Sequence, residues 1–254
     1  MNKIFVIATL TIREALRDRI LYLLLLFAII FIASSLIISK LTVGDEVKII
    51  KDFGLSAISF FGVLISIFIG IGLLYKEIDK KTIFTMIAKP IERYQFLIGK
   101  YIGLLITLFA IWLTMSIIFL LFILIKANWD NKLIFALISI YLEYIIITSI
   151  AILFSSFSTP ILSSIFSLCL FFIGHLIEGL KILTKKLHTA FFKSVAMFFY
   201  YLLPNLERYN LRGIVVHGDK IESSQLIYYF IYAILYSVCI LLLSIAIFQR
   251  RNFT

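Results

Sequence analysis

Six long apolar runs separate the charged residues of this chain, and they limit its fold more than any other feature. The runs cover residues 20–39, 55–75, 97–125, 133–154, 161–180 and 226–248. Each is about as long as an α-helix must be to cross the hydrocarbon core of a bilayer. Only 15% of the 254 residues are charged, against about a quarter in soluble domains. The sequence therefore predicts an all-α membrane protein, a single transmembrane domain over residues 1–254 with six spans and both termini on one side.

Residues 3–19 differ in pattern from the spans. Apolar residues recur there at helical spacing, and charged residues fall between them. This pattern is typical of a helix that lies in the plane of the membrane interface, with its apolar face in lipid. A solvated N-terminal helix is the alternative.

Residues 76–100 form a charged segment between the second and third runs. The segment holds six basic and three acidic residues, which is too many for the bilayer core. Residues 76–88 contain no Gly or Pro, and apolar residues recur there at helical spacing. Pro90 ends this helix because proline cannot continue it. We therefore expect a short amphipathic helix and a sharp break at the membrane surface, which suits a water-soluble partner; an ordinary connecting loop is the alternative.

Residues 181–225 are too many for a simple turn. Their aromatic run, 191–201, is shorter than a span and is interrupted by Lys193. We expect a re-entrant or interfacial segment there, before the last span, rather than a seventh crossing. Lys and Arg divide twelve to twelve between the two predicted faces, so the positive-inside rule assigns no orientation.

Motifs for nucleotide binding or catalysis are not found in this sequence. Gly99-Lys100 lacks the hydroxyl residue and the first glycine of a phosphate-binding loop, and the three histidines are widely spaced, without the rhythm of metal ligands. We therefore predict no catalytic residue, metal or cofactor in this chain. Its net charge of +10 lies at the ends of the apolar runs, which favours membrane lipids over nucleic acid as partners.

Glu143 lies near the middle of the fourth run. A carboxyl group in the membrane is costly and indicates function by default. The alternative is a protonated glutamate bonded to a Ser, a Thr or a backbone carbonyl group of a neighbouring helix. His175 and Glu178 lie near the end of the fifth run, and we expect both to reach the interface.

The charged segment resembles the signature of permease subunits in the second family of ATP-binding-cassette (ABC) exporters. In those permeases an acidic residue follows the second span, and then come a Thr, a short helix, a Pro with a basic residue close behind, and Gly-Lys at the third span. The matching residues here are Glu77, Thr82, residues 83–88 with Phe84, Pro90, Arg93, Gly99 and Lys100. The N-terminal helix, the six spans and the long loop before the last span match as well. PNLERYN at 204–210 resembles an element of a branch that includes relatives of the permease used in copper-enzyme maturation.

The resemblance implies that residues 76–96 are a cytoplasmic coupling region that contacts a separate ATPase subunit, on which ATP and Mg²⁺ bind. It further implies a second contact at Ser155–Pro160, cytoplasmic termini, an external loop at 181–225, and a second permease copy or homologue in the inner or plasma membrane. The small extramembrane part favours an apolar or amphipathic cargo. A stand-alone channel or secondary carrier is the main alternative. A lipid-modifying enzyme is another, with Glu143 and His175 as its only conceivable catalytic pair.

Overall fold

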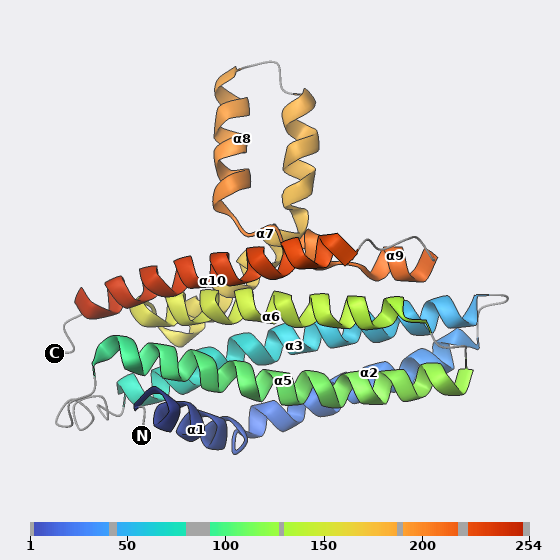
Figure 1. Ribbon diagram of the computed structural model, residues 1–254, viewed down its shortest axis with the longest axis horizontal. Coiled ribbons are helices and arrows are strands. Elements are labelled where there is room, and N and C mark those ends of the chain that lie inside the picture. The colour runs from blue at the N-terminus through green and yellow to red at the C-terminus, as the bar shows by residue number, and fades with distance from the viewer. Residues whose placement is uncertain are drawn as a thin grey trace.

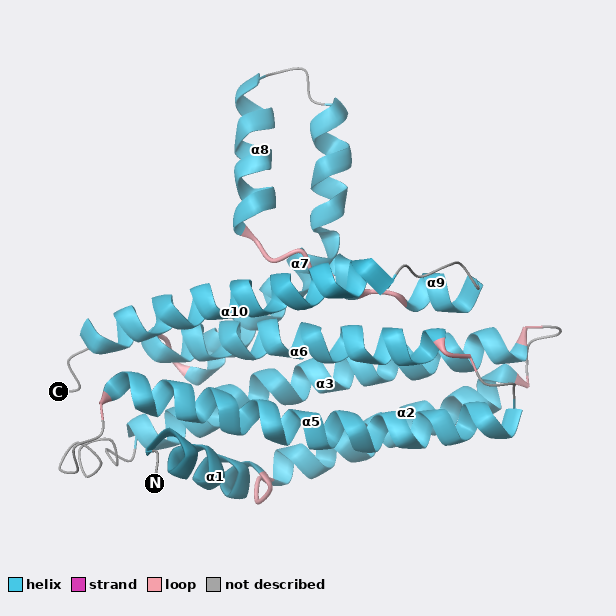
Figure 2. Cartoon of the chain, in the orientation of Figure 1, coloured by secondary structure: helices cyan, strands magenta, loops and turns pink. Residues whose placement is uncertain are grey.

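The computed structural model describes residues 3–40, 45–79, 92–126, 130–186, 190–217 and 223–250, and these ranges are helical with short connections (Figures 1 and 2). No strand occurs in them. The helices are α1 (Lys3–Ala15), α2 (Arg19–Ser39), α3 (Glu46–Asp79), α5 (Arg93–Lys126), α6 (Lys132–Phe157), α7 (Pro160–Lys186), α8 (Ala190–Leu202), the 3₁₀ helix η1 (Glu207–Tyr209), α9 (Arg212–His217) and α10 (Ser223–Arg250). Six of them, α2, α3, α5, α6, α7 and α10, are long and apolar enough to cross a membrane. The predicted all-α class with six spans is confirmed.

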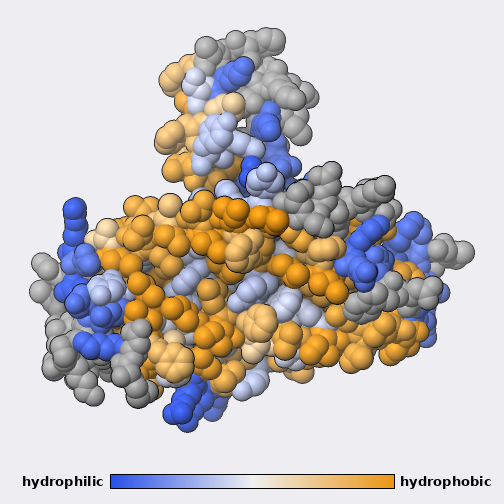
Figure 3. All heavy atoms as spheres, in the orientation of Figure 1, coloured by the Kyte–Doolittle hydropathy of each residue, from blue (hydrophilic) through white to orange (hydrophobic). Residues whose placement is uncertain are grey.

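Helices α3 and α6 form the centre of the bundle. In each, 72% of the most apolar window is buried, whereas the other four candidate spans are only 22–33% buried. Apolar residues cover the long side of the bundle, and hydrophilic residues gather mainly at its two ends (Figure 3). This distribution fits a bundle that is surrounded by lipid, because an unpaired charge is costly within the hydrocarbon core.

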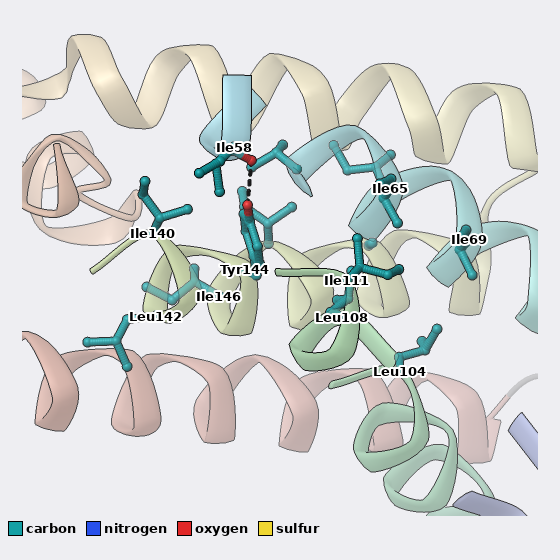
Figure 4. Close-up of a cluster of buried hydrophobic side chains, with 14 of the residues drawn as sticks. Ile58, Ile65, Ile69, Leu104, Leu108, Ile111, Ile140, Leu142, Tyr144 and Ile146 are labelled. Atoms are coloured by element: carbon teal, nitrogen blue, oxygen red, sulfur yellow. Dashed lines mark hydrogen bonds between the residues drawn. The ribbon is translucent and has the colours of Figure 1, made fainter. Parts of the chain in front are cut away.

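Tyr144 of α6 shows how closely the two central helices pack (Figure 4). Its side chain is fully buried, and its hydroxyl group donates a hydrogen bond to the carbonyl oxygen of Ile58 on α3. A Cβ atom at Gly62 would overlap the ring and hydroxyl group of Tyr144. Gly62 is therefore required for this approach, as small residues commonly are between helices in lipid.

Helix α3 begins nine residues earlier than the predicted second span. Residues 46–54 precede the predicted span, but they continue the helix towards the end of the bundle. Glu46 lies in the first turn, where a carboxylate is favourable, and its side chain approaches Lys126. Lys51 donates to Asp130 with Nζ and Oδ2 2.8 Å apart. The two residues of each ion pair are far apart in the sequence, so local composition could not predict these pairs.

Helix α1 packs on α5 through the face that the sequence predicted to lie in lipid. Ile7, Ala8 and Ala15 of that face are buried. A Cβ atom at Gly103 of α5 would lie 2.7 Å from the carbonyl oxygen of Ala8. The interfacial role of α1 stays a prediction, but the expected orientation of its apolar face is wrong, because Gly99 and Gly103 leave a groove on α5 that this face fills.

The region 181–225 is largely helical rather than a loop. Helix α7 continues to Lys186, and its second half and α8 form an antiparallel pair that stands out from the bundle (Figure 1). The chain then returns to the bundle through η1 and α9. The aromatic run at 191–201 lies in α8, and its re-entrant or interfacial position stays a prediction.

Candidate functional site

The charged residues at one end of the bundle connect the two borders of the predicted coupling region to the rest of the bundle. Lys100 of α5 is almost completely buried, with its side chain 3% exposed. Its Nζ lies 2.7 Å from Glu77 Oε1 at the end of α3 and 3.1 Å from Glu14 Oε2 of α1. A buried ammonium group must be paired in this way, because an isolated one would strongly destabilise the folded protein. Lys100 therefore joins α1, α3 and α5 at one point.

Arg93 links the first turn of α5 to the last turn of α10. Its Nη1 donates to the carbonyl oxygens of Phe248 at 3.1 Å and Gln249 at 2.8 Å. Carbonyl groups in the last turn of a helix have no partner within that helix, and a cation is favourable there. The rings of Phe96 and Phe248 stack beside this contact.

Asp18 makes a further link at the same end, between α2 and α3. It caps α2 by accepting from the backbone N–H of Ile20 at 3.0 Å, and Lys76 Nζ lies 2.7 Å from its Oδ2. Burial acts to raise the pKa of the Asp18 carboxyl group, but the hydrogen bonds from Lys76 and Ile20, together with the charge of Lys76, outweigh it and lower that pKa. The carboxylate form is thus favoured.

The predicted coupling residues divide into two groups. Thr82, Phe84 and Pro90 lie outside the residues that the structure describes. Glu77, Arg93, Gly99 and Lys100 are described, and all four contact other parts of the same chain: Gly99 touches α1, with its hypothetical Cβ 2.8 Å from Ile7 Cβ. These four residues join the borders of the predicted coupling region to α1, α3, α5 and α10.

A second polar site lies inside the bundle, around Glu143. Glu143 is 1% exposed. Its Oε1 lies 2.8 Å from His175 Nε2, and its Oε2 accepts from the hydroxyl group of Ser59 at 3.1 Å. His175 therefore does not reach the interface as expected, since it turns inward from α7 to meet α6. Glu178 is exposed.

The PNLERYN segment and its neighbour Arg212 complete this site. Glu207 Oε2 lies 3.1 Å from His175 Nδ1, and Asn210 donates to Glu207 Oε1 at 3.0 Å. Arg212 donates through Nε to Asn210 at 2.8 Å and through Nη1 to Ser56 of α3 at 2.6 Å. The result is a continuous set of hydrogen bonds that we call the polar chain: Ser59, Glu143, His175, Glu207, Asn210, Arg212 and Ser56.

Sequence reasoning found Glu143 and missed most of its partners. Glu207, Asn210 and Arg212 lie in a region that resembled an external loop, and Glu207 is 32 residues from His175. The PNLERYN pattern was the feature of the sequence that could have pointed to these residues. The structure explains part of it, because the buried Tyr209 donates to the carbonyl oxygen of Tyr229 on α10 and the backbone N–H of Leu206 donates to Gly174 of α7.

The polar chain can hold and move a proton. Both ring nitrogens of His175 bond to carboxyl oxygens, from Glu143 and Glu207. Either an imidazolium lies between two carboxylates, or a neutral imidazole lies between one carboxylate and one protonated carboxyl group. Both arrangements carry one net negative charge, so a proton can shift within the trio without changing it. Within the described ranges, no group of three or more His, Cys, Asp or Glu side chains is arranged to hold a metal ion.

Fold and site together define a multi-pass α-helical membrane protein with paired charges at the end of the bundle and one polar chain within it. The sequence profile of the "ABC-2 family transporter protein" family matches residues 5–253. The chain thus belongs to the ABC-2 family of transporter proteins. A search of curated proteins gives no significant match.

Family membership fixes the broad role of the chain. It is a membrane-spanning component of an ABC transporter, and members of this family provide the membrane part of transport rather than its catalytic step. The six apolar helices agree with this role.

Proposed function

We propose that this chain is the permease subunit of an ABC transporter, and that it forms the substrate pathway while a separate ATPase subunit supplies the energy. Residues 76–96 are the coupling region and contact the ATPase, with Ser155–Pro160 as a second contact. ATP and Mg²⁺ bind to the ATPase and not to this chain. Both termini are cytoplasmic in the inner or plasma membrane, where a second copy or a homologue completes the pathway.

The observation that carries this proposal is the set of contacts at the borders of the coupling region. Glu77 and Lys100 tie one border to α1, and Arg93 ties the other to α10. A force applied to residues 80–91 therefore acts on α1, α3, α5 and α10 together. Nucleotide-driven movement of the ATPase changes the permease only if the ATPase binds two permease states with different free energies.

Co-purification tests the proposal. We expect the full-length chain, solubilised from its native membrane, to bring with it an ATPase that carries a phosphate-binding loop. Phe84→Ala should weaken this association and leave the thermal stability of the chain unchanged. The matched substitution Phe157→Ala, at an exposed position within the second contact, should weaken the association less. Recovery of the chain without an ATPase, or full association in Phe84→Ala, would overturn the proposed coupling contact.

The polar chain is the one observation that favours a stand-alone secondary carrier, since ionisable residues within a membrane commonly mark ion or proton pathways. Flux through vesicles that contain the purified chain without nucleotide or ATPase would support that function. Nucleotide-dependent flux that requires the ATPase would exclude it. The place of the chain within the branch that contains PNLERYN likewise stays a proposal.

A further inference from the structure

A cavity of about 460 Å³ lies between α2, α3 and α7. Its volume falls within the range of about 300–1,000 Å³ that is typical of small-molecule sites. Five of its ten lining residues are phenylalanine, and four others have polar side chains. The lining residues are Phe31, Ala57, Phe60, Phe61, Phe171 and Phe172, together with Ser56, Ser59, His175 and Arg212.

The aromatic wall reaches the surface that faces lipid. Phe31 of α2, Phe60 of α3 and Phe172 of α7 are 40%, 42% and 53% exposed. They belong to three different helices, so the exposed rim of the cavity is apolar on several sides. Deeper in the wall, the ring of Phe171 packs edge-on against the imidazole ring of His175, with 4.8 Å between the centroids. The aromatic and the polar parts of the cavity are thus adjacent.

The polar part carries a cation, Arg212, whose hydrogen-bond partners among the described residues are uncharged. Arg212 bonds to Asn210 and Ser56, which are both neutral, and forms no ion pair within the described ranges. A guanidinium group has five N–H donors, so donors remain for a ligand. An anionic ligand would pair with this partly buried cation and offset the cost of its burial.

The nearby carboxyl groups lie outside the wall of this cavity. Glu143 and Glu207 are the acidic residues of the polar chain, and neither lines the cavity. Both are bonded to His175, which is the member of the trio that lines the cavity. Glu143, Asn210 and Arg212 also line a second, much smaller void behind this wall. The volume of that void, about 10 Å³, is close to the smallest that holds a water molecule.

We infer that this cavity binds an amphiphile with an acyl chain and a small anionic headgroup, a carboxylate or a phosphate monoester. The acyl chain lies among the phenylalanine rings, and the headgroup accepts hydrogen bonds from Arg212 and from Ser56. Guanidinium groups form strong charge-assisted hydrogen bonds of this kind with carboxylates and phosphates. This inference names a substrate class, and only the step from binding to transport rests on the proposed function.

Photolabelling of the purified full-length chain in a neutral detergent tests the inference. Three diazirine probes of equal chain length are compared: a fatty acid, an alkyl phosphate and the fatty alcohol. We expect saturable labelling of peptides from α2, α3 and α7 by one or both anionic probes, and at least about tenfold weaker labelling by the alcohol. The stronger anionic probe tells a free fatty acid from a phosphate-bearing lipid. Equal labelling by the alcohol, or no saturable labelling at these helices, would overturn the inference.

Variants locate the headgroup. Arg212→Gln keeps hydrogen-bonding capacity towards Asn210 but removes the charge, and should weaken anionic labelling at least about tenfold. Arg212→Lys should retain most of it. Arg208→Gln is the matched control, because Arg208 lies over the ring of Tyr232 and outside the cavity. Undiminished labelling in a folded Arg212→Gln, or an equal loss in Arg208→Gln, would contradict the assignment.

The wild-type comparison of probes needs no variant, so the inference stays testable even if Arg212→Gln does not fold. Binding is measured without the ATPase. Failure to bind an anionic amphiphile would leave co-purification with the ATPase unaffected, and loss of co-purification would leave binding unaffected. The two proposals can therefore fail separately.

Discussion

Replacing Glu77 by Gln is expected to destabilise the end of the bundle where the coupling region begins. The substitution preserves shape but removes the charge that lies 2.7 Å from Lys100 Nζ. Breaking a buried ion pair by removing one partner costs about 3–5 kcal/mol. Glu14 remains 3.1 Å from the same ammonium group, so we expect about 3 kcal/mol, the low end of that range.

The double variant Glu77→Gln/Lys100→Met removes both charges of the ion pair, and so distinguishes the interaction between them from the other contacts of the two side chains. Methionine fills similar space without a charge, and such apolar replacements of whole buried pairs are often nearly neutral. We therefore expect Lys100→Met alone to cost about as much as Glu77→Gln, and the double variant to cost about 1 kcal/mol. The two single effects should be far from additive, because the residues are in direct contact.

Thermal unfolding of the detergent-solubilised chain, followed by size-exclusion chromatography, measures these effects. A loss of about 3 kcal/mol corresponds to a fall in Tm of about 6–12 °C for a chain of this size. Glu178→Gln makes the same chemical change at an exposed position and should leave the Tm unchanged. An unchanged Tm in Glu77→Gln, or additive effects in the double variant, would refute the reasoning.

Two further predictions concern the core and the opposite end of the bundle. Gly62→Ala should lower the stability by about 2–4 kcal/mol, because the new methyl group displaces Tyr144 and its buried hydrogen bond, whereas Gly72→Ala, with nothing within 4 Å, should have little effect on the Tm. Burial raises the pKa of Asp130, but the hydrogen bond from Lys51 is among the effects that outweigh it, so the pKa is lowered overall. The ionised Asp130 carboxylate therefore stabilises the folded state above the unfolded-state pKa, and this stabilisation is lost as the pH falls through the folded-state pKa. The wild type should consequently lose more Tm than Asp130→Asn between about pH 5 and pH 3.

The spans could be predicted from the sequence because a helix that is surrounded by lipid must be apolar along its whole run. Residues 226–248, for example, are apolar almost throughout, and α10 contains them all. Helix ends were harder to predict. The extension of α3 back to Glu46 depends on ion pairs with Lys126 and Asp130, which are distant in sequence and close only after the bundle forms.

The polar chain was predicted only in part for a similar reason. Glu143 stood out because a carboxyl group in an apolar run is conspicuous. Arg212 did not, since a charged residue in a presumed loop is ordinary. Its significance comes from its contact with Ser56, 156 residues away, and from the cavity that both residues line.

The central claim is that residues 76–96 receive force from a separate ATPase, and photocrosslinking in native membranes tests it most directly. A photoreactive amino acid is placed at Phe84 and, as the control, at Lys48, an exposed position near the start of α3 at the opposite end of the bundle. We predict a crosslink from position 84 to an ATPase subunit, in a yield that changes when ATP is added, and none from position 48. A crosslink to the ATPase from position 48, or none from position 84 in a functional transporter, would contradict the account.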